Sequence, residues 1–146
     1  MSTPSRPSSL IKPTLDTKFH IDYDWWERTP GEDLRVYLLS HLPQEQHERF
    51  NHIDPASTVD YIDPETGEVL QLDELGLALQ VAAEAPDFIT GDTPLINSIF
   101  RVLLKNHNTP VSSRELAALT GRQAETILRL ISGSQVYKGI RPYMGD

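Results

Sequence analysis

Hydrogen-bond donors recur along one side of the segment from Arg122 to Ser132. Apolar residues in this segment follow a helical spacing and form one face, made of Ala124, Ile127, Leu128 and Ile131. The other side chains therefore point outward, namely Arg122, Gln123, Glu125, Thr126 and Arg129. Glutamine pairs with adenine and arginine with guanine through two hydrogen bonds each, and an arginine at a helix start suits a phosphate. Placed in a major groove, such a helix would present side chains that can pair with bases.

The residues before this segment supply a partner helix. Ser112 and Glu115 have the spacing of a capping box, which fixes where the partner helix begins. Ala117 stands four residues before Gly121, so a small residue lets the helices cross closely while the glycine adopts a positive φ at the turn. Ile127 and Leu130 then fill the wedge between the helices. The spacing predicts two helices joined by a tight turn.

The flanking segments extend this pattern. A helix-like run, PLINSIFRVLLKNHN, comes first, and GSQVYKGIRPY follows as a short strand, a tight turn and a second strand. In this order, residues 94–143 resemble the winged helix-turn-helix superfamily. The resemblance implies a DNA-contacting set made of Arg114, Arg122, Gln123, Thr126, Arg129, Lys138 and Arg141. Lys138 and Arg141 would lie on the wing, against the minor groove or its phosphates. A protein-docking role stays open, because winged helices bind DNA in many families and proteins in others.

Charge is distributed unevenly along the 146 residues, whose net charge is −8. Residues 1–94 carry six Lys and Arg against eighteen Asp and Glu, whereas residues 95–146 carry seven against three. An asymmetry of this kind indicates separate roles for the two halves. The basic half is the one that resembles a winged helix.

Three regions are predicted, in a predominantly helical α+β fold. Residues 1–17, rich in proline and in Ser and Thr, are expected to form a flexible tail. Residues 18–92 are expected to form an acidic helix-and-hairpin region, and residues 93–146 a winged helix-turn-helix domain. Within the acidic region, a β-hairpin is predicted over residues 59–72 with Gly67 in the turn, followed by a helix that Asp73 caps.

An aromatic group opens the acidic region and consists of Phe19, Tyr23, Trp25 and Trp26. The alternation of apolar and polar residues from Phe19 to Trp25 predicts an extended segment with one buried face, which Trp26 ends. Two interpretations remain open for these rings. They cover the core of the acidic half, or they form a hook that inserts into a partner protein.

The metal-binding residue types are present without the spacing of a metal site. Cysteine is absent, and the histidines of the acidic region lie six and five residues apart, at His41, His47 and His52. Ligating pairs on a helix usually lie three or four residues apart. Part of a calcium loop is mimicked by Asp63, Glu65 and Glu74. Its glycine comes one place too early, however, and a hairpin turn explains these residues. We expect no metal and no cofactor.

The motifs of enzymes are missing too. Serines stand where they cap helices, carboxylates are scattered, and no glycine-rich loop follows a predicted strand. The sequence has no apolar run long enough to span a membrane, and residues 1–14 lack the apolar core of a secretory signal. We therefore expect a small cytoplasmic DNA-binding protein without enzymatic activity, a transcription regulator or an accessory factor of DNA-handling machinery. The alternative is a protein–protein adaptor whose winged helix is a docking module.

Overall fold

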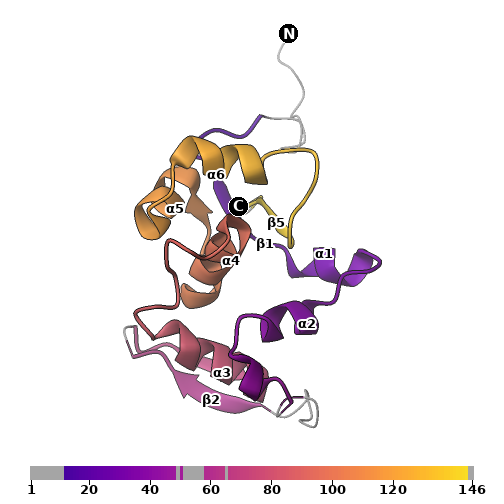
Figure 1. Ribbon diagram of the computed structural model, residues 1–146, viewed down its shortest axis with the longest axis vertical. Helices are drawn as coiled ribbons and strands as arrows, with labels where there is room; N and C mark the ends of the chain where they lie inside the picture. Colours follow the sequence, from indigo (N-terminus) through magenta and orange to yellow (C-terminus); the bar gives the residue numbers. More distant parts are fainter. Residues whose placement is uncertain (1–11, 49, 51–57, 65, 145–146) are drawn as a thin grey trace. The chain divides into compact units, whose positions relative to one another are not determined.

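The computed structural model describes residues 12–48, 50, 58–64 and 66–144 of the chain. The fold is mixed α+β, with six α-helices and two small antiparallel sheets among these residues (Figure 1). Two compact units divide the chain: the split unit, made of residues 1–30 and 89–146, and the acidic unit, made of residues 31–88. This division differs from the predicted ranges 18–92 and 93–146, because the first strand joins the C-terminal segment.

The sheet of the split unit contains three strands in the order β4-β1-β5. The central strand β1 spans Lys18–Ile21, and β4 (Val111–Ser112) and β5 (Ile140–Pro142) pair with it in antiparallel register. Alternation along β1 buries Phe19 and Ile21, as the period of two in the sequence predicts. The central strand of this sheet therefore lies far before both of its neighbours in the sequence, since Phe19 pairs with Val111 of β4 and with Pro142 of β5.

Four helices complete the split unit: α1 (Tyr23–Arg28), α4 (Leu95–Lys105), α5 (Ser113–Thr120) and α6 (Ala124–Ile131). The helix α4 supplies much of the core, since Ile99, Phe100 and Leu103 are fully buried. Trp26 of α1 packs edge-on against Phe100, with the ring centroids 6.3 Å apart. Strand β1 and helix α1 thus share one core with the C-terminal segment.

Asn108 fastens β1 to the end of α4. Its side-chain Oδ1 accepts a hydrogen bond from the Ile21 N–H at 2.7 Å, and its Nδ2 donates to the Ile21 carbonyl at 2.9 Å. The backbone at Asn108 has a positive φ of 61°, and its N–H donates to the Leu103 carbonyl. Asparagine tolerates this conformation better than most residues. One amide side chain therefore mimics a strand neighbour for Ile21.

The β-hairpin predicted for the wing does not form, because only its second strand is present. Residues 132–139 hold no strand, and β5 pairs with β1 instead of with a strand just before it. A turn at Lys138 (φ 55°) and Gly139 (φ 76°) directs the chain into β5, and the Gly139 carbonyl accepts from the Asp22 N–H at 2.7 Å. The neighbour of β5 in the sheet is therefore the N-terminal strand β1.

The predicted extended segment from Phe19 to Trp25 is also shorter than expected. Strand β1 ends at Ile21, and the Asp22 side chain caps α1 by accepting from the Asp24 N–H. A helix then turns Trp26 into the core, where only 4% of it is exposed. The capping carboxylate overrides the alternating pattern, because it satisfies a free N–H at the helix start.

The acidic unit contains α2 (Leu34–Leu39), a 3₁₀ turn η2 (Gln44–Gln46), β2 (Val59–Ile62), β3 (Val69–Leu72) and α3 (Glu74–Ala83). The predicted hairpin is confirmed, with Val59 opposite Leu72, Ile62 opposite Val69, and Gly67 at a φ of 75°. The Asp73 side chain accepts from the Gly76 N–H at 2.7 Å, as the predicted cap requires.

Candidate nucleic-acid interface

The helix pair α5–α6 begins and turns as the sequence predicts. The Ser112 side chain accepts from the Glu115 N–H, and the Glu115 carboxylate accepts from the Ser112 N–H at 2.9 Å, which completes the capping box. Helix α5 ends at Gly121, whose φ of 75° is left-handed and whose N–H donates to the Ala117 carbonyl. Helix α6 begins at Ala124, three residues after Gly121, with Gln123 as its N-cap. The tight turn between the helices is confirmed.

Helix α6 separates an apolar face from an outward face. Ile127 and Ile131 are buried in the core of the split unit. The exposed side chains are those of Gln123, Glu125, Thr126 and Arg129, which the sequence places outward. The helix starts at Ala124 rather than near Arg122, because the backbone of Gln123 is extended. Gln123 therefore stands at the very beginning of the helix, where donors are best placed to enter a groove.

Arg122 has a different position from the one predicted. Its guanidinium Nη1 donates to the Thr93 carbonyl at 3.1 Å, and its side chain is half-buried. Thr93 lies just before α4, so this bond ties the α5–α6 turn to the start of the core helix. Arg122 positions the outward helix, whereas the resemblance implies a phosphate contact.

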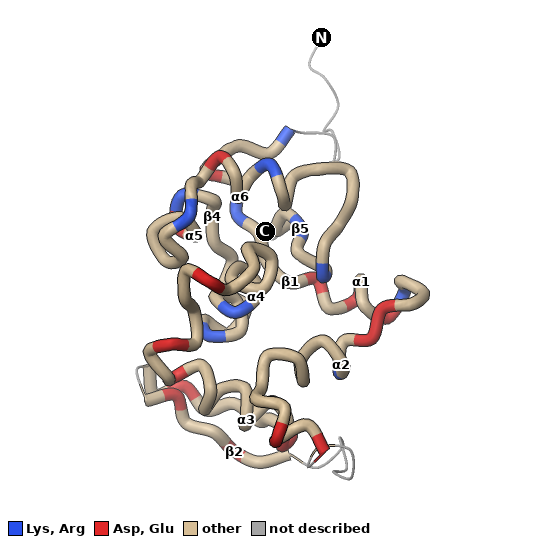
Figure 2. Tube along the Cα trace, in the orientation of Figure 1, with Lys and Arg blue, Asp and Glu red and all other residues tan. Residues whose placement is uncertain are grey.

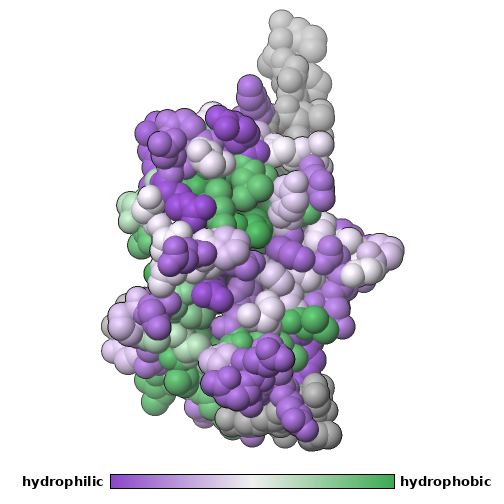
Figure 3. Space-filling view, in the orientation of Figure 1, coloured by the Kyte–Doolittle hydropathy of each residue, from purple (hydrophilic) through white to green (hydrophobic). Residues whose placement is uncertain are grey.

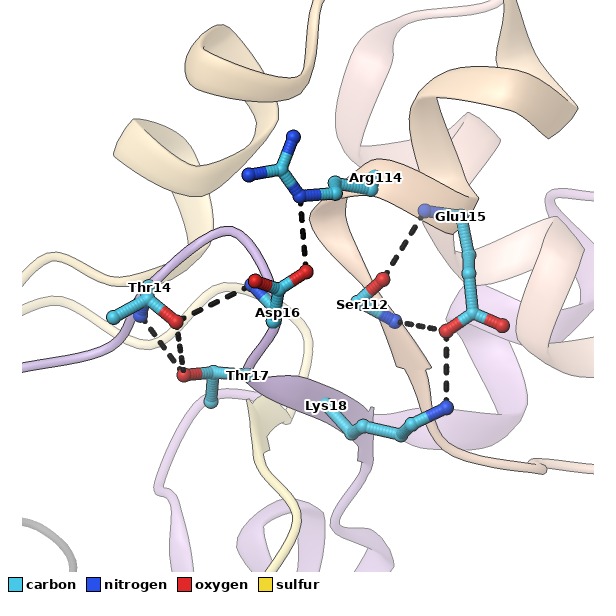
Figure 4. A network of polar contacts seen from close by, with 7 residues as sticks. All are labelled: Thr14, Asp16, Thr17, Lys18, Ser112, Arg114 and Glu115. Carbon is cyan, nitrogen blue, oxygen red and sulfur yellow. Dashed lines mark hydrogen bonds and ion pairs between the residues drawn. The ribbon is translucent and has the colours of Figure 1, made fainter.

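The start of α5 carries two exposed ion pairs (Figure 4). The Arg114 Nε lies 2.9 Å from the Asp16 Oδ1, and the Lys18 Nζ lies 3.1 Å from the Glu115 Oε1. Hydrogen bonds from the Ser112 N–H and from Lys18 lower the pKa of Glu115. Arg114 also donates its backbone N–H to the Leu15 carbonyl. Residues just before β1, which fall in the predicted tail, thus contact the start of α5.

Lys138 and Arg141 face α1 and do not project from a hairpin. The Lys138 ammonium lies 5.8 Å from the ring centroid of Trp26. The Arg141 Nη1 lies 3.2 Å from the Asp22 Oδ2, which also accepts from the Arg28 Nη2 at 3.1 Å. Burial raises the pKa of Asp22, but the two arginines and the Asp24 N–H outweigh it and hold the pKa below 3.8.

The aromatic group divides between core and surface. Phe19 is completely buried and Trp26 nearly so, which excludes both as anchors for a partner in this conformation. Tyr23 is 41% exposed, and Trp25 is half-buried with its ring edge-on to Trp26. Of the four aromatic residues predicted to bind a protein, only Tyr23 and Trp25 are therefore accessible at the surface.

Three positions that matter to this site escaped the sequence interpretation. Asn108 and Asp22 hold the elements around α1 and β1, and their partners lie 87 and 119 residues away. Leu119 is 58% exposed on α5, beside the turn into α6. An outward leucine on a predicted amphipathic helix was the available signal for Leu119. No local pattern marks the other two.

The histidines and carboxylates of the described residues are dispersed. No group of three His, Asp or Glu side chains there is arranged to hold a metal ion. His41 is buried against Tyr37, and the His47 Nε2 lies 2.9 Å from the Leu42 carbonyl, whereas His52 falls outside the described residues. Within the same described ranges, no helix is long and apolar enough to cross a membrane.

Charge separates with the two units (Figure 2). By sequence, the split unit has eleven Lys and Arg against eight Asp and Glu, a net charge of +3. The acidic unit has two against thirteen, a net charge of −11. The helix pair α5–α6 therefore belongs to the only one of the two units that a phosphate backbone would attract.

Comparisons with known proteins add no identification. No protein-family model matches the chain, and neither a curated protein nor a solved structure is similar to it.

Proposed function

We propose that the protein binds duplex DNA through α6, with α5 as the supporting helix of a helix-turn-helix. The observation that carries the proposal is the outward face of α6, on which Gln123, Thr126 and Arg129 are exposed. Amide and guanidinium groups pair bidentately with adenine and guanine, and a threonine contacts either a base or a thymine methyl group. A transcription regulator or a cytoplasmic accessory factor of DNA-handling machinery would use such a helix.

Phosphate contacts come from the start of α5 in this proposal. Arg114 and Lys18 are 61% and 54% exposed, and each is paired with an exposed carboxylate. Surface pairs of this kind contribute about 0–1 kcal/mol, so a phosphate can replace the carboxylate at small cost. Both cations lie beside the first turn of α5, whose dipole also favours an anion.

Glu125 restricts the DNA that this face accepts. Its carboxylate is exposed on α6, one turn before Arg129. A carboxylate repels phosphate but accepts a hydrogen bond from the amino group of cytosine. We expect Glu125→Gln to strengthen binding to mixed-sequence DNA and to weaken sequence preference.

The full chain provides the test, by fluorescence anisotropy with a labelled mixed-sequence duplex at several salt concentrations. Phosphate contacts by Arg114 and Lys18 predict a slope of log affinity against log salt of roughly −2. Arg114→Gln is expected to make the slope shallower by about one, and Arg129→Ala to cost about 1–3 kcal/mol on a preferred sequence.

Arg28→Gln is the matched control, since it removes the same charge from α1, where no DNA contact is proposed. It should change the slope much less than Arg114→Gln. If Arg28→Gln changed the slope as much as Arg114→Gln, general charge attraction would explain the binding. A chain that is folded by circular dichroism and does not bind DNA at low salt would contradict the proposal.

Protein docking by the same helix pair is the second candidate. Leu119 is 58% exposed beside the turn, and hydrophobic residues reach the surface near α6 and α4 in Figure 3. Exposed apolar groups contribute to protein interfaces more than to contacts with phosphate. Leu119→Ser should leave DNA affinity unchanged. If it abolishes binding to a protein captured by the wild-type chain, and DNA does not bind, docking is the better explanation.

A further inference from the structure

The β2–β3 hairpin of the acidic unit has one face that is exposed at each of its four strand positions. Directly opposite residues share a face, and so do residues two apart along a strand. The pairs Val59–Leu72 and Tyr61–Leu70 therefore form one face, and Asp60–Gln71 and Ile62–Val69 form the other. Tyr61 reaches α3, where its hydroxyl donates to the Glu84 carboxylate at 2.6 Å. The face with Tyr61 is the inner one, and the second pair set forms the outer face.

The outer face is apolar at one end and acidic at the other. Ile62 is 65% exposed and Val69 is 60% exposed, and they are direct cross-strand partners. Asp60 and Gln71 are exposed beside them and share a hydrogen bond of 3.3 Å. Hydrophobic residues also reach the surface around β2 and α3 in Figure 3. Ile62 and Val69 therefore form a small apolar patch that is continuous across the two strands.

The charge of the unit selects the occupant. Residues 31–88 have a net charge of −11, so two copies of this face repel each other. A segment with lysine or arginine beside apolar residues complements both the isoleucine–valine pair and the exposed Asp60 beside it. We propose that the outer face of the β2–β3 hairpin docks a basic, amphipathic segment of another protein.

This docking surface is separate from the proposed DNA contacts. It lies on a different unit, uses apolar packing with carboxylates, and contains none of the residues assigned to DNA. A regulator that holds DNA with one unit and a basic protein segment with the other would link the two. The docking proposal does not depend on DNA binding.

The test uses the full chain and a fluorescein-labelled amphipathic peptide built of leucine and lysine. Fluorescence anisotropy should show saturable binding that weakens as salt rises. The double variant Ile62→Thr, Val69→Thr keeps branched residues in both strands and should weaken binding about tenfold or more. Asp60→Asn keeps the acceptor for Gln71 and should weaken binding by about two- to fivefold.

Val36→Thr is the matched control. Val36 is 62% exposed on α2 of the same acidic unit and lies outside the hairpin, so its loss should leave the affinity unchanged. A second peptide, with glutamate in place of lysine, should not bind. Circular dichroism of each variant separates lost binding from lost folding.

Several outcomes would overturn the proposal. Equal affinity of the double variant and the wild type would show that charge alone attracts the peptide. If the folded wild-type chain did not bind the peptide, the proposed docking surface would be wrong. Analytical ultracentrifugation tests whether a second copy of the chain occupies the face instead. If the wild type is a dimer and the double variant is a monomer, the face is a dimer interface and the proposal is wrong. Arg129→Ala should leave peptide binding unchanged, so failure of this proposal and failure of DNA binding are distinguishable.

Discussion

The two units bury their apolar residues to different extents. Among the described residues, the split unit buries thirteen hydrophobic side chains and the acidic unit six. The large hydrophobic residues left exposed in the acidic unit are aliphatic, namely Val36, Val59, Ile62, Val69 and Val81. Those of the split unit include three tyrosines, which carry a polar group to the water. The split unit has the larger core, and the acidic unit leaves more aliphatic side chains exposed.

Replacing one buried phenylalanine in each unit with alanine tests this comparison with the largest expected effect. Phe19 and Phe50 are both at most 1% exposed, one in each unit, and replacing either with alanine should cost its unit about 3–5 kcal/mol. Both tryptophans lie in the split unit, so tryptophan fluorescence during urea unfolding reports on that unit. Phe19→Ala should lower the fluorescence midpoint much more than Phe50→Ala. Equal shifts would mean that the units unfold as one.

Two glycines sharpen the comparison within the split unit. Gly121 and Gly139 have nearly the same φ, 75° and 76°. A Cβ on Gly121 would meet nothing within 4 Å, whereas a Cβ on Gly139 would lie 2.9 Å from the Trp26 Nε1 and 3.0 Å from the Asp22 carbonyl oxygen.

Gly121→Ala should therefore cost about 1–2 kcal/mol from the backbone alone. Gly139→Ala should cost about 1–3 kcal/mol more, because neighbouring atoms must move. Thermal unfolding of the two variants measures the difference. Equal losses would show that Trp26 does not pack against this turn.

A smaller effect is expected from the carboxylate that joins α1 to β5. The pKa of Asp22 is lowered, so its ionised form adds stability above the ordinary value of 3.8, and that stability is lost as pH falls through the lower folded pKa. Asp22→Asn keeps an acceptor for the helix cap but loses the charge that Arg28 and Arg141 pair with. The variant should be about 0.5–1 kcal/mol less stable near pH 7.

Urea unfolding at several pH values measures this dependence. The difference between wild type and Asp22→Asn should shrink below about pH 4 and vanish once the folded carboxyl is protonated. A difference that stays constant across this range would contradict the ion pairs of Asp22.

Local features of the fold could be predicted from the sequence because their causes lie within a few residues. The capping box of Ser112 and Glu115, the left-handed Gly121 and the turn at Gly67 each depend on neighbours at most four positions away. The outward face of α6 also follows from a local period. These signals place α5, α6 and the β2–β3 hairpin correctly.

The non-local pairings could not be predicted in the same way. Strand β1 has four residues, and nothing in them indicates whether they pair within the acidic region or with β4 and β5. The predicted wing hairpin is wrong for this reason, because β5 pairs with the N-terminal strand β1. Arg122 and Arg141 looked like free cations because their acceptors, Thr93 and Asp22, lie 29 and 119 residues away.

The fragment 93–146 illustrates the consequence. It contains α4, α5, α6 and β5, but it lacks β1, with the buried side chains of Phe19 and Ile21, and the Trp26 ring of α1. Exposing that core would cost more than a small unit can lose. Experiments on DNA binding therefore need the whole chain.

The most direct measurement is a titration of the full ¹⁵N-labelled chain with duplex DNA, followed by the chemical shifts of backbone amides. We predict that the shifts concentrate in residues 113–131, with Gln123, Thr126 and Arg129 among the largest, while the β2–β3 hairpin stays unchanged. Shifts confined to residues 31–88, or a folded spectrum that DNA does not alter, would contradict the assignment of α6 as the DNA-contacting helix.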